Sequence, residues 1–115
     1  MPNKPEAVEQ IKVAKFLEMI GALYTCSLAG AYLSVGQLAQ LKRMGYTKGT
    51  PDIMVFHPGR SPYVHGLFIE MKSEKGRVSD EQKEWGKRAE ELGYRYYVCH
   101  SAEEAIGIIR TYLNV

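Results

Sequence analysis

The sequence has few cysteines, no long apolar run and no strong excess of one charge. Its two cysteines, Cys26 and Cys99, have neither zinc-ligand spacing nor a Cys-x-x-Cys partner, so we expect reduced thiols in a cytoplasmic protein. No apolar stretch approaches the ~20 residues of a membrane span, and the polar N-terminus is unlike a secretory signal. Fifteen basic and thirteen acidic residues give a net charge of +2, which neither requires nor excludes a polyanionic partner.

The remaining composition is that of one folded domain. Hydrophobic residues make up 45% of the chain and charged residues 24%, values that argue against disordered and fibrous classes. A length of 115 residues predicts a single domain spanning residues 1–115. Such a chain is long enough to bury a core without disulfides.

Helical periodicity predicts four helices. The first runs from Pro5 to about Ile20 and carries an apolar stripe that includes Val13 and Leu17. Three further helices begin after serines that have Gln or Glu three residues later, the pattern of a capping box. These serines are Ser34, Ser79 and Ser101.

Apolar runs predict the strands. A brief strand is expected within residues 22–33, a second at Pro51–His57, a third at about His65–Lys72 and a fourth at about Tyr94–His100. The turn residues Pro58–Pro62 predict that the second and third strands form an antiparallel hairpin. Together with the helices, this order implies an α/β fold with a small mixed β-sheet flanked by helices.

Acidic and basic residues gather at one end of the predicted hairpin. Residues two apart in a strand point the same way, so Glu70 and Lys72 share a face, and antiparallel pairing brings Asp52 near them. Buried charges are costly unless they are paired or bind a metal. Two carboxylates with open positions suit Mg²⁺ or Mn²⁺, which can activate water for attack on a phosphodiester. Lys72 is placed to orient that water.

Three further positions have two interpretations each. Glu6 continues the inward stripe of the first helix toward the same cluster, with Glu9 as the alternative acid. Gln82 could contribute to the site, but it also occupies the third position of the Ser79 capping box, where glutamine has a structural role. Trp85 is expected in the core rather than as a platform for a nucleobase.

Three segments carry a family resemblance. Gly49–Asp52, Gly66–Lys72 and Gly76–Trp85 resemble, in order, the motifs of the VRR-NUC domain, a branch of the PD-(D/E)xK nuclease superfamily, and the resemblance covers nearly the whole chain. It implies a restriction-endonuclease-like core. It also implies functional residues: metal ligation by Asp52, Glu70, the Met71 carbonyl and Glu6, and catalytic roles for these acids with Lys72 and Gln82.

The resemblance implies an activity as well. The implied activity is that of a Mg²⁺- or Mn²⁺-dependent deoxyribonuclease, an endonuclease that hydrolyses phosphodiester bonds with metal-activated water. Stand-alone members of this size look like phage or bacterial enzymes that act as homodimers on branched DNA, such as Holliday junctions or flaps. Basic residues flank the motifs and are expected to bind DNA phosphates: Lys42, Arg43, Lys48, Lys75 and Arg77.

Two other functions fit the same fold. One is an inactive module that binds DNA structures, and the other is a nuclease subunit that cuts only with a helicase or another replication or repair partner. The complete set of Asp52, Glu70 and Lys72 argues against the inactive module. A small-molecule α/β enzyme is not favoured, because the sequence contains no glycine-rich phosphate loop and no nucleophile elbow.

Overall fold

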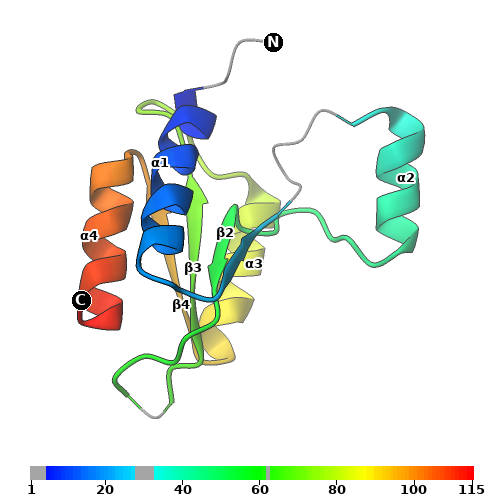
Figure 1. The fold of residues 1–115 in the computed structure, drawn as a ribbon. Helices are drawn as coiled ribbons and strands as arrows, with labels where there is room; N and C mark the ends of the chain where they lie inside the picture. The colour runs from blue at the N-terminus through cyan, green and yellow to red at the C-terminus, as the bar shows by residue number, and fades with distance from the viewer. Residues whose placement is uncertain (1–4, 28–32, 62) are drawn as a thin grey trace.

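A mixed β-sheet with helices on both faces forms the body of the protein. The computed structural model describes residues 5–27, 33–61 and 63–115, and over these ranges the chain has four strands and four helices. In order they are α1 (Pro5–Met19), β1 (Tyr24–Cys26), α2 (Val35–Arg43), β2 (Ile53–Val55), β3 (Gly66–Met71), α3 (Asp80–Glu91), β4 (Tyr94–Cys99) and α4 (Ala102–Leu113). The strands lie side by side in chain order, with β3 and β4 parallel and the other neighbours antiparallel. The predicted small mixed sheet flanked by helices is confirmed (Figure 1).

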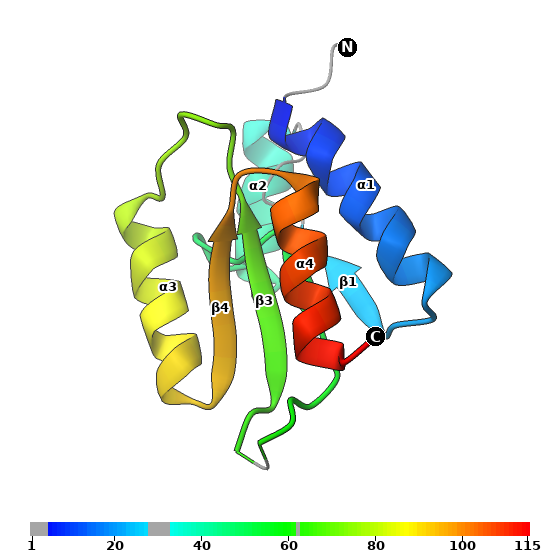
Figure 2. The same ribbon diagram turned by 90° about the vertical axis from the view of Figure 1, so that its left-hand side faces the viewer.

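The two faces of the sheet are covered differently. Helices α1 and α4 pack on one face and enclose the main core, whereas α3 lies on the other face (Figure 1). Figure 2 looks onto the α1 and α4 layer. All six residues of β3 are buried, which identifies β3 as a central strand, as the two-sided apolar pattern predicted.

Alternation along β3 separates the two layers. Ile69 and Met71 belong to the core under α1 and α4. Phe68 points to the opposite face, where its ring meets Trp85 of α3 edge-on at 5.3 Å between centroids. Glu70, two residues after Phe68, therefore lies on the α3 face.

The predicted helix positions agree with the structure more closely than the predicted strand lengths do. Val13 and Leu17 of α1 are fully buried, as the stripe predicted. The strand expected at Pro51–His57 is shorter, because its partner β1 pairs with only Ile53–Val55. Pro62, the last residue of the predicted turn, lies outside the described residues. Among the described residues, no helix has both the length and the apolar character that crossing a bilayer demands.

Helix α2 stands apart from the body of the molecule (Figure 1). Its capping box at Ser34 forms as predicted, with reciprocal hydrogen bonds between Ser34 and Gln37. It buries no residue, and the side chains of Val35 and Met44 are 89% and 72% exposed. The helix therefore adds nothing to the core, although its sequence is amphipathic.

The loop that leads into β2 packs against the start of α3. Gly49 has a positive φ of 93°, and a Cβ atom there would lie 2.5 Å from the carbonyl oxygen of Glu81. The neighbouring Lys48 forms an ion pair with the Glu81 carboxylate at 3.2 Å. Glycine at position 49 thus allows the chain to reach Asp52 while touching α3.

Replacing Gly49 by alanine tests this close approach. Gly45 is the matched control, because its φ is also positive at 110° but no atom lies within 4 Å of a Cβ built on it. Gly45→Ala should lower the free energy of unfolding by about 1 kcal/mol, because of its left-handed conformation alone. Gly49→Ala should lower it by at least ~2 kcal/mol, because the overlap with the backbone adds to that penalty. Urea unfolding of the two variants measures the difference. Equal losses would show that the contact with Glu81 does not constrain the loop.

Candidate active site

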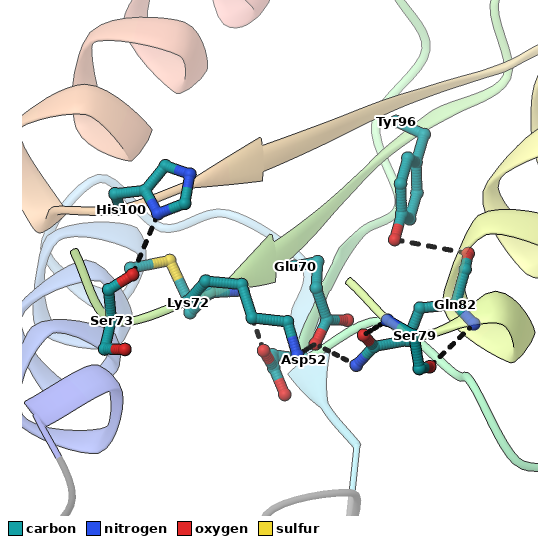
Figure 3. Close-up of polar contacts among 9 residues, drawn as sticks. Asp52, Glu70, Lys72, Ser73, Ser79, Gln82, Tyr96 and His100 are labelled. Carbon is teal, nitrogen blue, oxygen red and sulfur yellow. Dashed lines mark hydrogen bonds and ion pairs between the residues drawn. The ribbon is translucent and has the colours of Figure 1, made fainter. Parts of the chain in front are cut away.

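Two carboxylates face each other where β2 begins and β3 ends. The antiparallel register pairs Ile53 with Ile69, so the preceding Asp52 lies opposite Glu70, and directly opposed side chains in a sheet are ~5 Å apart at Cβ. The Met71 backbone N–H donates a hydrogen bond of 2.7 Å to Oδ2 of Asp52. This bond holds the aspartate against the end of β3 (Figure 3).

Glu70 is a buried carboxylate with one unpaired oxygen. Its side chain is 2% exposed. Its Oε1 accepts a hydrogen bond of 2.7 Å from Nε2 of Gln82 and lies 3.8 Å from Nζ of Lys72. Its Oε2 is buried and has no hydrogen-bond partner among the described residues. A buried polar atom is more stable with a partner than without one, so this oxygen is suited to accept a further polar or cationic partner.

Burial raises the pKa of both acids, and the charge of Asp52 adds to the effect on Glu70. Burial, and secondly the charge of Asp52, raise the pKa of Glu70 to about 8. Burial also raises the pKa of Asp52, although its hydrogen bond from Met71 acts in the opposite direction. Two carboxyl groups that resist ionisation side by side would both be stabilised as anions by a cation between them.

The donor set fits a hard divalent cation. Mg²⁺ prefers oxygen ligands and keeps several of its waters, so Asp52, the unpaired Oε2 of Glu70 and the Met71 carbonyl could supply the protein part of its coordination. Within residues 5–27, 33–61 and 63–115, no three His, Cys, Asp or Glu side chains gather as a complete ligand set.

Lys72 is fixed beside the acids by the strand that it follows. Its backbone N–H donates to the Cys99 carbonyl at 2.8 Å, which extends the β3–β4 pairing by one residue. Its side chain is 20% exposed and points toward Glu70 (Figure 3). An ammonium group therefore lies at the edge of the carboxylate pair.

Gln82 forms the predicted capping box, and its side-chain amide also contacts Glu70. Its Oε1 accepts from the Ser79 backbone N–H at 2.8 Å, which completes the capping box of α3. Its Nε2 donates to Glu70. The cap therefore orients the amide that contacts the buried glutamate.

The two acids of α1 lie in different surroundings. Glu9 accepts a hydrogen bond of 3.1 Å from the Ala102 backbone N–H at the start of α4 and forms an ion pair with Lys12 at 2.7 Å. These contacts, with Lys12 first, lower the pKa of Glu9. The charge of Glu6 instead contributes to raising the pKa of Asp52, although Glu6 does not join Asp52 and Glu70 in a three-ligand cluster among the described residues.

The five basic residues expected to bind DNA lie on the surface in two groups. Lys42 and Arg43 end helix α2, and Lys48 follows in the loop, paired with Glu81. Lys75 and Arg77 are exposed in the loop between Lys72 and α3. The second group directly follows the lysine of the site in sequence, whereas α2 carries its group away from the sheet.

Tyr96 is a site neighbour that the sequence analysis did not identify. It pairs with Phe68 in the β3–β4 register and therefore lies on the α3 face. Its hydroxyl donates a long 3.5 Å hydrogen bond to the Gln82 carbonyl (Figure 3). Burial, followed by the charges of Glu70 and Asp52, raises its pKa. The strand register, which a sequence alone does not give, was the missing information.

The raised pKa of Glu70 predicts a pH-dependent stability for the metal-free protein. The unfolded chain releases this proton near pH 4.5 and the folded protein near pH 8, so between these values only the folded state holds it. The free energy of unfolding should therefore fall as pH rises through this interval, by at most ~1.4 kcal/mol per pH unit. In Glu70→Gln most of this slope should disappear. Urea unfolding in EDTA at several pH values tests both statements, and identical slopes in the two proteins would contradict them.

Known proteins share both the sequence pattern and the fold of this chain. The VRR-NUC domain model matches residues 8–103. A solved structure titled "VRR_NUC domain protein" is 24% identical with a TM-score of 0.76, over 98% of this chain and 91% of the other. Another, "VRR_NUC domain", is 22% identical with a TM-score of 0.64, over 96% and 99% of the two chains. No curated protein matches. Since the family match spans most of the 115 residues, the chain belongs to the VRR-NUC family of nuclease domains.

Proposed function

We propose that the protein is a Mg²⁺- or Mn²⁺-dependent DNA endonuclease. The observation that carries the proposal is the buried Glu70, whose Oε2 has no hydrogen-bond partner among the described residues and whose pKa is raised by burial and by the neighbouring Asp52. A divalent cation bound there would neutralise the two acids, polarise a phosphodiester oxygen and lower the pKa of a bound water. The nuclease family of the chain supports a phosphodiester as the substrate.

Each residue of the site has a role that follows from its contacts. Asp52 and Glu70 bind the cation, with the aspartate held by the Met71 N–H and the glutamate by Gln82. The Nζ of Lys72 donates to a phosphate oxygen or to the attacking water, and offsets charge that develops on the phosphate. Glu6 influences the site through its charge, which reaches Asp52.

The substrate class that we propose is branched DNA, bound by a homodimer. The exposed Lys75 and Arg77, which follow Lys72 in sequence, supply phosphate contacts near the acids, and the basic residues of α2 would supply more distant ones. One copy is small, with a radius of gyration of 14.2 Å, so its grip on a duplex is limited. Two copies related by a two-fold axis would present two sites to the arms of one junction.

Cleavage assays test this proposal directly. With Mg²⁺ or Mn²⁺, wild-type protein should cut labelled flap and four-way DNA faster than linear duplex. Lys72→Ala should reduce cleavage by at least ~100-fold, because it removes a charged group from the transition state. Lys15→Ala, an exposed lysine on α1, is the control and should cut normally.

Three results would contradict this proposal in different ways. Equal cleavage by wild type and Lys72→Ala would remove the mechanism. Binding without cleavage under both metals would favour a DNA-recognition module. Cleavage that begins only after a helicase is added would favour a nuclease subunit.

The double role of Gln82 can be separated by two substitutions in one capping box. Ser79→Ala removes the hydroxyl that accepts from the Gln82 N–H but keeps the backbone N–H that orients the Gln82 amide. Both Ser79→Ala and Gln82→Ala should lose ~1 kcal/mol of stability. Only Gln82→Ala should also lose cleavage, by about 10- to 100-fold, because it frees the metal-binding Glu70. Equal cleavage by the two variants would reduce Gln82 to a helix cap.

A further inference from the structure

An apolar pocket lies on the α3 face of the sheet, on the same face as the carboxylates. It has a volume of about 310 Å³. Its walls come from β3, α3 and the start of β4: Phe68, Trp85, Arg88, Ala89, Leu92 and Tyr94. Trp85, expected in the core, is instead half-buried and faces this pocket.

The pocket lies next to the candidate active site along two elements, β3 and α3. Phe68 precedes Glu70 by two residues on the same face of β3, a distance of ~7 Å along the strand. Trp85 follows Gln82 by three residues on α3, a rise of ~4.5 Å. A phosphodiester at the carboxylates would therefore place the adjoining nucleotide over the pocket.

The pocket walls are suited to a flat ring attached to a phosphate. Phe68 and Tyr94 are stacked at 4.7 Å between centroids, and Trp85 meets Phe68 edge-on. The only charged group in the lining is the guanidinium of Arg88, a planar cation that can stack on a base or bind a phosphate. Aromatic walls favour the face of any base and offer few hydrogen bonds that would distinguish one base from another.

We infer that this pocket holds an unpaired nucleobase of the strand that is cut, an inference that rests on the proposed nuclease function. A base inside a duplex is stacked and paired, and must leave the stack to reach such a pocket. The substrate class is therefore DNA with an unpaired nucleotide next to the scissile phosphate, with no strong preference for the identity of the base. Flaps and open junctions contain such nucleotides, whereas a continuous duplex does not.

Trp85 provides a direct readout of this inference, because it is the only tryptophan in the chain. The Lys72→Ala variant with Mg²⁺ is titrated with a flap oligonucleotide, and the DNA is checked to remain intact. Stacking of a base in the pocket should quench Trp85 fluorescence. A flap that lacks the base at the nucleotide beside the cleavage site should bind about 5- to 150-fold more weakly, the worth of one stacked base, and should leave the fluorescence unchanged.

Two exposed leucines provide a matched test that spares the core. Leu92 at the pocket and Leu23 away from it are each 65% exposed, so Leu92→Glu and Leu23→Glu change the charge equally at positions of equal burial. Leu92→Glu should lose at least ~5-fold in affinity for the flap and most of the quenching, whereas Leu23→Glu should lose neither. Circular dichroism establishes that both variants fold.

The possible outcomes separate this inference from the proposed function. Equal affinity and equal quenching with the abasic flap would overturn the pocket assignment, while cleavage by the wild type would leave the nuclease proposal standing. Equal losses for Leu92→Glu and Leu23→Glu would also overturn it. Failure to bind or cut any DNA would instead count against the proposed function itself.

Discussion

The site depends on an unfavourable interaction that the fold enforces, the burial of the Glu70 carboxylate against Asp52. Burial raises the pKa of both acids, the charge of Asp52 raises that of Glu70 further, and Oε2 of Glu70 has no hydrogen-bond partner among the described residues. The protein offsets part of this cost with the Gln82 amide, the Met71 N–H and the nearby Lys72 ammonium. The rest of the cost remains in the folded chain, and a divalent cation between the acids would relieve it. The Asp52–Glu70 pair therefore lowers the stability of the folded protein at the position where we propose catalysis, as is common at functional sites.

The architecture keeps this strained position rigid on one side and open on the other. Helices α1 and α4 bury one face of the sheet completely enough that β2 and β3 cannot shift in register without exposing the core. The other face carries α3 (Figure 1), and the acids, the aromatic pocket and the lysine all lie on that face. Glycine at position 49 has no Cβ atom that would collide with the Glu81 backbone. It therefore lets the loop before Asp52 touch the start of α3.

Sequence analysis predicted the features that depend on local patterns. Two-residue alternation placed Glu70 and Lys72 on one face, and the turn after Pro58 correctly paired the two strands, so that Asp52 lies opposite Glu70. Features that depend on distant parts of the chain were harder to predict. The exposure of α2 and of Trp85 follows from which surfaces the remaining elements leave uncovered, and the neighbourhood of Tyr96 follows from the β3–β4 register. Sequence analysis assigned Gln82 two competing roles, a helix cap or a site residue. It could not show that the amide oxygen of Gln82 contacts Ser79 while its amide nitrogen contacts Glu70.

The central claim is that Asp52 and Glu70 together form a divalent metal site. Titration of the purified protein with Mn²⁺, followed by the electron paramagnetic resonance signal of the free ion, measures the number of ions bound per chain. The account predicts tight binding of at least about one ion per chain in the wild type, and loss of that binding in both Asp52→Asn and Glu70→Gln. Glu9→Gln, which removes a carboxylate already engaged by Ala102 and Lys12, should bind like the wild type. Undiminished binding in both Asp52→Asn and Glu70→Gln would contradict the account.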